Sequence, residues 1–164
     1  QHDRTNQIIG KLMGLKRTLE NILAHLLVLL MSLMVLNVLW QVFSRYVLGT
    51  PSAFTDELAR FLMIWLGLLG AAYVSGKNGH VAIDVLAKRA NAKNQRILKR
   101  TVSGFIILFC LAAMVTGGGW LVYTTYELKQ HSPALGLPLA YVYVVIPLSG
   151  LIVTYNKVVD IITD

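Results

Sequence analysis

Four long apolar runs follow one another along the sequence, and charged or turn-forming residues separate them. They cover about 20–47, 53–76, 97–126 and 138–160. A helix needs about 20 predominantly apolar residues to cross the hydrocarbon core of a bilayer. The pattern therefore predicts an all-α integral membrane protein with four transmembrane helices, which form a single membrane domain over residues 1–164.

Two shorter segments have apolar residues on one helical face and basic residues on the other. In about 5–17, apolar residues recur at helical spacing opposite Lys11 and Lys16. In about 80–92, Val85 and its neighbours one turn away can line one face. Such helices lie in the plane of the membrane interface, so the pattern predicts two amphipathic interfacial helices. The alternatives are a disordered tail for the first segment and a solvated loop for the second.

The composition agrees with a membrane protein. Hydrophobic residues make up 55% of the chain and charged residues 14%, whereas soluble domains average about 25% charged residues. The net charge is +7, and most Lys and Arg lie in the N-terminal tail and in 77–100. Cytoplasmic segments of membrane proteins carry such basic blocks, so both termini are predicted to be cytoplasmic. The basic blocks contain no aromatic residues, so we expect no nucleic-acid partner.

No combination of residues indicates an enzyme. Cys110 is the single cysteine, and the sequence has no nucleophile–base constellation and no glycine-rich phosphate loop. Only His25 lies within a predicted span, which is too few ligands for a haem held between helices. His80 and Asp84 are four residues apart, but two ligands do not make a metal site. We expect no catalytic, metal or substrate residue and no cofactor on this chain, and a structural role for His80 and Asp84 on the cytoplasmic side.

The second apolar run begins with a charged turn. Its uncharged part, Phe61 to Gly76, would be only about 24 Å long as a helix, which is shorter than a hydrocarbon core of about 30 Å. The charged turn must therefore lie at the hydrocarbon border. We expect Asp56 to pair with Arg60 at i,i+4, and Arg45 of the first helix to reach Glu57. Such pairs would fix the hairpin or dock a partner subunit. The alternative is exposed ion pairs that contribute less than about 1 kcal/mol.

Polar and small residues within the spans suggest how the helices pack. Asn37 and Gln41 are four residues apart and lie on one face of the first helix. Polar groups in hydrocarbon seek partners on neighbouring helices, so we expect this face to meet another helix. In the second helix, Gly67, Gly70 and Ala71 have the spacing of a close-packing face.

Two further positions predict irregular helices. Three consecutive glycines, Gly117–Gly119, each weaken a helix by about 1 kcal/mol relative to alanine, so we expect a bend or a very close contact there. Pro147 can kink the fourth helix, because proline lacks the amide hydrogen of a helical residue.

Four stretches of the sequence together resemble a known family. They are RY at 45–46, TDELARFLMIWLGLLGAA at 55–72, GHVAIDVL at 79–86 and SPALGLPLAYVYVVIPLSG at 132–150. In their order and spacing, these stretches are similar to the small membrane subunit, of DctQ type, of tripartite ATP-independent periplasmic (TRAP) transporters. Four spans with both termini inside match that family. Phe54 departs from its pattern, because many members have tryptophan before the acidic residues.

The resemblance implies a multi-subunit importer in the bacterial cytoplasmic (inner) membrane. A large membrane subunit carries the substrate and sodium, and a periplasmic binding protein delivers an organic acid such as a C4-dicarboxylate, a sugar acid or sialic acid. The small subunit is implied to be a non-catalytic scaffold in the lipid bilayer. It braces the large subunit and contributes to docking of the binding protein, and sodium binds the large subunit rather than this chain.

Two other functions stay open when the residues are considered alone. A stand-alone four-helix transporter of small solutes would need an ionisable group within the membrane, and Glu20 at the end of a helix is a poor candidate. A membrane anchor of an enzyme complex is the other alternative, for which a haem spectrum in the purified protein would be evidence.

Overall fold

The computed structural model describes residues 2–77 and 92–163. Its helices are α1 (His2–Tyr46), α2 (Ala53–Gly76), α4 (Ala92–Phe109), the π-helix η1 (Cys110–Gly117), α5 (Gly118–Glu127), α6 (Leu139–Tyr143) and α7 (Val145–Thr163). The third span consists of α4, η1 and α5, which follow one another without a break, and the fourth consists of α6 and α7. All four predicted spans are confirmed as helices that are long and apolar enough to cross a membrane.

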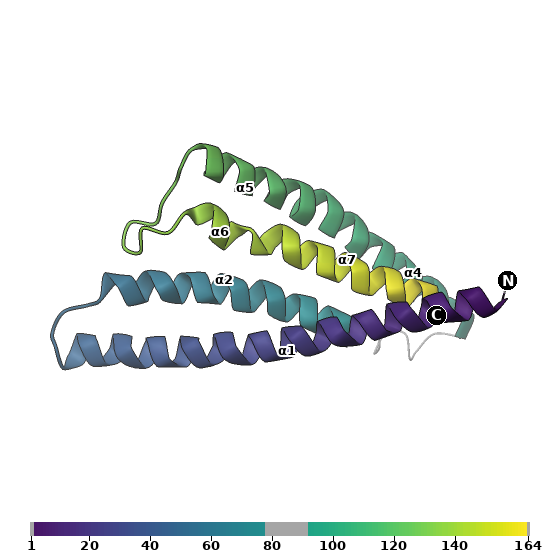
Figure 1. Ribbon diagram of the computed structural model, residues 1–164, viewed down its shortest axis with the longest axis horizontal. Coiled ribbons are helices and arrows are strands. Elements are labelled where there is room, and N and C mark those ends of the chain that lie inside the picture. The colour runs from purple at the N-terminus through teal and green to yellow at the C-terminus, as the bar shows by residue number, and fades with distance from the viewer. Residues whose placement is uncertain (1, 78–91, 164) are drawn as a thin grey trace.

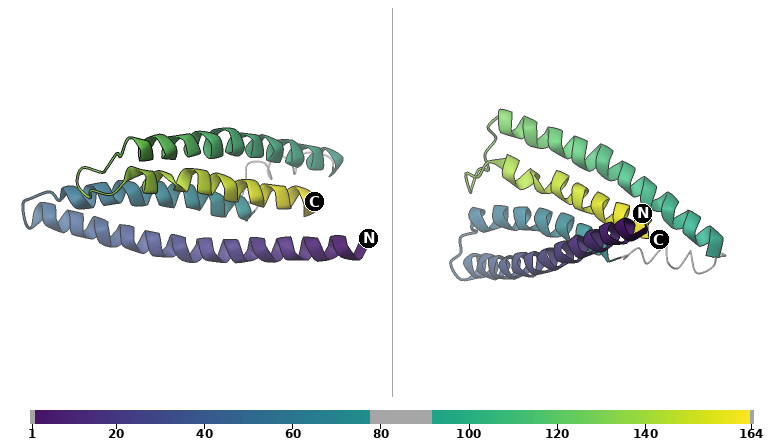
Figure 2. Two further views of the ribbon diagram at one scale, coloured as in Figure 1. Left: turned by 45° about the horizontal axis from the view of Figure 1, so that its top comes forward. Right: turned by 45° about the vertical axis from the view of Figure 1, so that its right-hand side comes forward.

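The spans lie side by side in the order α1, α2, α7 and the α4–η1–α5 helix, as Figure 1 and Figure 2 show. Both chain termini lie at one end of this array, which we call the terminal end. The connecting segments 47–52 and 128–138 lie at the opposite end, which we call the loop end. The helices converge at the terminal end and spread apart toward the loop end (Figure 1). This open array leaves wide helix faces that the chain itself does not cover.

The packed core is small and lies around α2 and α7. Its buried apolar side chains form two clusters, one of Leu23, Leu69 and Val145 and the other of Ala72, Cys110 and Val153. Large apolar side chains on the flanking helices are exposed, among them Leu36, Trp40, Phe105 and Trp120. Exposed apolar surface on this scale marks contact with lipid or with another membrane protein.

The predicted interfacial helix over 5–17 is not a separate element. It forms the first turns of α1, which continues without a break to Tyr46 and is about 67 Å long at the usual helical rise. The sequence offers no stop signal between this segment and the first span, since α1 has no proline and the two glycines Gly10 and Gly14 only weaken a helix. The prediction of two elements was therefore wrong. Residues 80–91 of the second predicted interfacial helix lie outside the described residues.

The irregularities predicted in the third and fourth spans are present. The eight residues before Gly118 form the π-helix, and a Cβ added at Gly118 would lie 2.8 Å from Ile146 Cγ2, so this glycine permits a close helix contact. The fourth span is interrupted at Val144, between α6 and α7. This break fits Pro147, because its ring nitrogen cannot donate the helical hydrogen bond to the carbonyl four residues earlier.

The predicted close-packing face of α2 is not covered by any of the described residues. Gly67 and Ala71 are exposed, and a Cβ added at Gly67 or Gly70 would meet nothing within 4 Å. The buried residues of α2 lie on another face, with Leu69 and Ala72 at its centre. Small residues on both faces permit close approach, so their spacing does not say which face meets a helix of the same chain. That these three residues pack closely against another helix stays a prediction, and within the described residues that helix is not one of the other spans.

Candidate functional site

At the loop end, polar side chains of α1 face α2. Asn37 Nδ2 donates a hydrogen bond of 2.8 Å to the main-chain carbonyl of Thr55, and both residues are buried. One turn further along α1, Gln41 Nε2 donates to Asp56 Oδ1 at 3.3 Å. The expectation that this polar stripe meets a neighbouring helix is confirmed. A buried amide that is satisfied by a backbone carbonyl fixes the register of α1 against α2.

The two acidic residues of the charged turn, Asp56 and Glu57, bind different parts of the chain. Asp56 Oδ2 and Arg60 Nη2 form the predicted ion pair at 2.9 Å, with the side chains 53% and 74% exposed. At that exposure the pair stabilises the fold by less than about 1 kcal/mol. The predicted pair between Arg45 and Glu57 is wrong, because Glu57 binds a different part of the chain. Consecutive helical residues point about 100° apart, so Asp56 and Glu57 cannot both face α1.

Glu57 holds the second connecting loop against α2. Its Oε2 accepts hydrogen bonds from the main-chain amides of Ala134, at 2.8 Å, and Leu135, at 2.9 Å. The Ser132 hydroxyl accepts a further hydrogen bond of 3.2 Å from the amide of Leu135. The loop is closed on itself by the amide of Ser132, which donates to the carbonyl of Leu137 at 2.9 Å. One carboxylate therefore ties the α5–α6 connection to the α1–α2 hairpin.

Arg45 lies at the end of α1 with an exposed side chain and makes no salt bridge to any residue that the structure describes. It borders a pocket of about 230 Å³ together with Gln41, Ser52 and Asp56. A guanidinium at the border of the hydrocarbon region is available to an acidic group that residues 2–77 and 92–163 do not supply.

A second polar cluster, at the terminal end, was not predicted. Lys16 of α1 and Lys157 of α7 both bind the carboxylate of Asp160, Lys157 at 3.5 Å. Lys157 is only 3% exposed. The Tyr155 hydroxyl donates to the carbonyl of Leu12 at 3.1 Å, which gives α1 and α7 a second link. A sequence signal did exist, since Lys157 and Asp160 are three residues apart in the last turns of the fourth span.

Asn156 links α7 to α2 beside this cluster. It is 1% exposed, and its Nδ2 donates to the carbonyl of Ala72 at 3.4 Å. A Cβ added at Gly76 would lie 2.9 Å from the same Nδ2 and 3.2 Å from Glu20 Oε1, so a larger residue there would displace the Asn156 amide. Lys77, the next residue, places its ammonium 5.1 Å from the centre of the Tyr73 ring. The Tyr73 side chain raises the pKa of Lys77 above its usual value.

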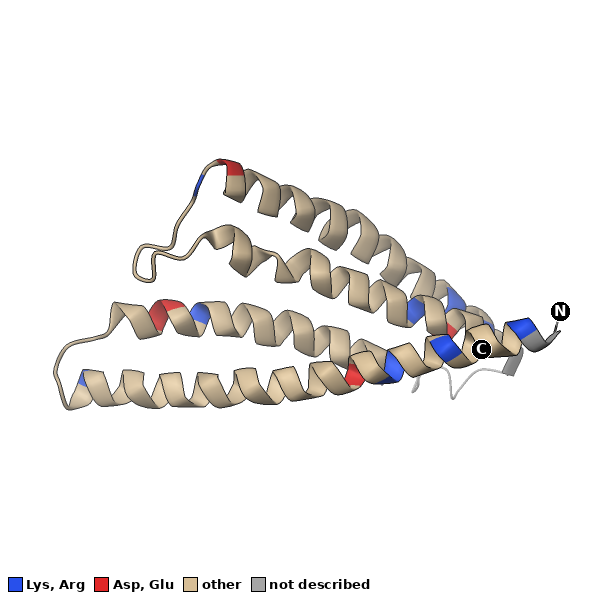
Figure 3. Cartoon of the chain, in the orientation of Figure 1, with Lys and Arg blue, Asp and Glu red and all other residues tan. Residues whose placement is uncertain are grey.

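No metal site is found among the described residues. His80 and Asp84 lie outside the described residues, so their structural role stays a prediction. In the part of the chain that the structure describes, no three His, Cys, Asp or Glu side chains gather as metal ligands would. Figure 3 shows that the charged residues drawn in colour lie toward the two ends of the array and leave its middle uncharged.

The family follows from comparison of the sequence with known proteins. A sequence profile described as "Tripartite ATP-independent periplasmic transporters, DctQ component" matches residues 34–164. The chain belongs to this family. It is thus a multi-pass membrane component of a TRAP transporter and not an enzyme.

Individual TRAP relatives agree with this assignment. A putative TRAP transporter small permease protein of Haemophilus influenzae is 29% identical over 140 residues, which cover 85% of this chain and 83% of the relative. The ectoine TRAP transporter small permease protein of Halomonas elongata is 30% identical over 151 residues, 92% of this chain and 76% of the relative.

A third TRAP relative has a different architecture. The isethionate TRAP transporter permease protein DctMQ of Oleidesulfovibrio alaskensis is 27% identical over 105 residues, which cover 62% of this chain but only 16% of the relative. In that protein the region similar to this chain is part of a much longer polypeptide. Small TRAP permease subunits work with a large membrane subunit, and the fused relative agrees with that partnership.

Proposed function

We propose that this chain is a scaffold subunit that braces the large membrane subunit of a sodium-coupled TRAP importer and does not itself carry substrate. The placement of its charges carries this proposal. Transport paths through membranes usually include ionisable groups at membrane depth. Here the described acids and bases lie toward the ends of the array, and Asp56 and Glu57 are engaged in ion pairs or hydrogen bonds.

The open array supports a bracing role. A single layer of helices exposes far more apolar surface than a closed bundle does, and the exposed face of α2 includes Gly67 and Ala71. Small residues on an uncovered helix face allow the backbone of a second helix to approach closely. We propose that the large subunit contacts this α2 face and the guanidinium of Arg45, which forms no salt bridge with the described residues.

The orientation and the location are part of the same proposal. Basic residues concentrate at the terminal end, so both termini lie in the cytoplasm and the loop end faces the periplasm across the inner membrane. The loop that Glu57 fixes would then be presented to the periplasmic binding protein, and we propose that it contributes to docking that protein.

The cargo is determined by the other two components. Two of the relatives are named for ectoine and isethionate, which are chemically different molecules. We propose an organic acid, such as a C4-dicarboxylate, a sugar acid or sialic acid. Sodium coupling belongs to the large subunit.

Co-purification tests the proposal. The tagged chain is expressed together with a large TRAP permease subunit from the same organism, extracted in mild detergent and examined by native mass spectrometry. We expect a complex of both chains, weakened by Gly67→Trp on the uncovered α2 face and unchanged by Ser32→Trp on exposed α1. A chain that always elutes without the large permease would contradict the proposal.

A further inference from the structure

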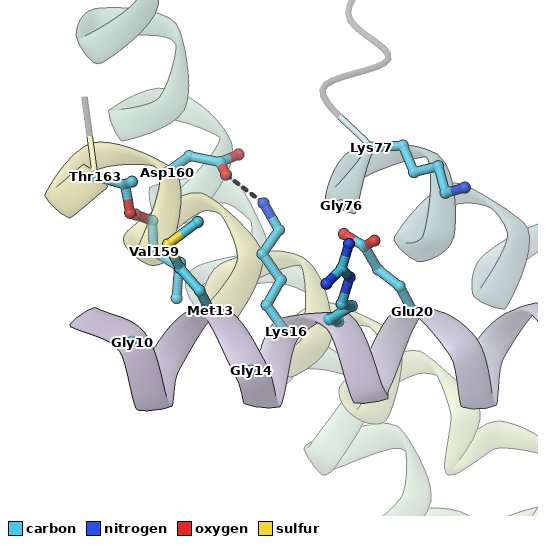
Figure 4. Close-up of a pocket in the computed structure, with 11 residues that line it drawn as sticks. Gly10, Met13, Gly14, Lys16, Glu20, Gly76, Lys77, Val159, Asp160 and Thr163 are labelled. Atoms are coloured by element: carbon cyan, nitrogen blue, oxygen red, sulfur yellow. Dashed lines mark hydrogen bonds and ion pairs between the residues drawn. The ribbon is translucent and has the colours of Figure 1, made fainter. Parts of the chain in front are cut away.

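A pocket at the terminal end is not explained by the contacts described above. It has a volume of about 660 Å³ and lies between α1 and the last turns of α2 and α7. Its charged lining residues are Lys16, Arg17, Glu20, Lys77 and Asp160. Figure 4 shows Lys16 reaching from α1 to Asp160 of α7, with Glu20 directed toward the end of α2 at Gly76. Pockets of this size accommodate small organic ligands.

Positive charge in and beside the pocket is incompletely matched. Lys16 and Lys157 share the one carboxylate of Asp160, so two ammonium groups face one negative charge. Lys157 is 3% exposed, and a buried ammonium without full compensation is strongly unfavourable. Arg17 lines the same pocket and forms no salt bridge within the described residues. The pocket therefore has room for one further negative group near Lys16 and Arg17.

Glu20 gives the part of the pocket beside the end of α2 a different character. Its Oε1 lies 3.2 Å from the position that a Cβ on Gly76 would take, so the carboxylate sits where α2 ends. Within residues 2–77 and 92–163 Glu20 forms no salt bridge, and Lys77 of the same pocket lining interacts with it electrostatically without direct contact. A ligand with a single negative charge would gain nothing from this carboxylate. A ligand that carries a cationic hydrogen-bond donor beside its anion would bind Glu20 as well as Lys16 and Arg17.

The position of the pocket restricts the source of such a ligand. The spans α2 and α7 both end beside it, at Gly76 and Thr163, so it lies at the level where the apolar helices leave the hydrocarbon. The side chains of Met13 and Val159 add an apolar part to its lining. A phospholipid headgroup meets these conditions, because it places charged groups at the border of the hydrocarbon and continues into apolar chains.

We propose that this pocket binds the headgroup of an ethanolamine phospholipid. The phosphate lies beside Lys16 and the guanidinium of Arg17, which donates charge-assisted hydrogen bonds to it. The ethanolamine ammonium donates to the Glu20 carboxylate. A lipid seated there bridges α1, α2 and α7 at the terminal end and compensates the second ammonium on Asp160.

Native mass spectrometry of the delipidated full chain in detergent tests this site. Phosphatidylethanolamine, phosphatidylcholine, phosphatidylglycerol and inorganic phosphate are titrated separately. We expect phosphatidylethanolamine to bind most tightly. Arg17→Ala should weaken its binding about tenfold, as expected for the loss of a charge-assisted contact, whereas the matched control Lys11→Ala, on the same helix and outside the pocket, should leave it unchanged.

Glu20→Gln separates the two ends of the headgroup. This variant should remove the preference for phosphatidylethanolamine over phosphatidylglycerol and retain the binding of both lipids. Equal binding of all three lipids by the unmodified chain would overturn the proposal. So would equal losses in Arg17→Ala and Lys11→Ala. Binding of inorganic phosphate as tight as that of the lipid would assign the pocket to a free anion and would also overturn it.

Discussion

The two ends of the helix array are held together by different chemistry. At the loop end, side-chain amides and a carboxylate bind main-chain groups across helices, as Asn37 and Glu57 do, and the one ion pair is largely exposed. At the terminal end, a buried ammonium and a second lysine converge on Asp160. Contacts to main-chain groups fix geometry without adding net charge, whereas a buried charge network makes each member indispensable. The terminal end should therefore be the end that is more sensitive to a single substitution.

The largest expected effect comes from Asp160→Asn. This change leaves Lys157 buried without a counter-ion and should lower the free energy of unfolding by about 3–5 kcal/mol. Thermal unfolding of the purified chain in detergent measures the effect. The matched control is the same change at the loop end, Asp56→Asn, which removes only an exposed pair and should cost less than about 1 kcal/mol. Equal losses of unfolding free energy in the two variants would contradict the claim that the terminal end is the more sensitive one.

A large local effect is expected from Glu57→Ala. The amide of Ala134 loses its acceptor, the amide of Leu135 keeps only its 3.2 Å bond to Ser132 Oγ, and the loop loses its tie to α2. Hydrogen exchange at these two amides should become about tenfold faster or more, because local opening now breaks fewer hydrogen bonds. Exchange at the terminal end should be unchanged. If the two amides kept the exchange rates of the unmodified chain, Glu57 would not be what holds the loop.

Asn37→Ala should have a moderate effect. The buried carbonyl of Thr55 loses the hydrogen bond from Asn37 Nδ2, and we expect a loss of about 1 kcal/mol in the free energy of unfolding. Ser32→Ala is the control on the same helix, because the exposed Ser32 hydroxyl bonds only the carbonyl of Val28 in its own helix. A similar loss in both variants would mean that the contact between α1 and α2 does not depend on this amide.

The smallest effect on stability is expected from Arg45→Ala. Because Arg45 forms no salt bridge within the described residues, the free energy of unfolding should change by less than about 0.5 kcal/mol. Thermal unfolding of the isolated chain is the measurement. A loss above 1 kcal/mol would reveal a partner for this arginine inside the chain. The same variant should weaken co-purification with the large subunit, where we place its acidic partner.

The helices and their irregularities were predictable from the sequence, because the length of an apolar run and the positions of glycine and proline are local properties. The four spans, the irregular third span near Gly118 and the break before Pro147 all follow from such signals. The ion pair between Asp56 and Arg60 was predictable for the same reason, since both residues lie on one helix. The continuous α1 was missed because a basic amphipathic segment and the span that follows it have no stop signal between them.

Contacts between helices that are distant in the sequence were not predictable. Glu57 binds amides 77 and 78 residues away, and Lys16 binds a carboxylate 144 residues away. Nothing local distinguishes these partners from others of the same charge. The face of α2 was ambiguous for a similar reason, since Gly67 and Gly76 both permit a close approach and only the fold places Asn156 beside the second.

Reconstitution into proteoliposomes tests most directly whether this chain is a brace and not a carrier. The chain alone, the large permease alone and both together are given a sodium gradient, a substrate-loaded binding protein and a labelled organic acid. The scaffold role predicts uptake only when both membrane subunits are present, and none with this chain alone. Sodium-dependent or sodium-independent uptake by this chain without the large permease would contradict it.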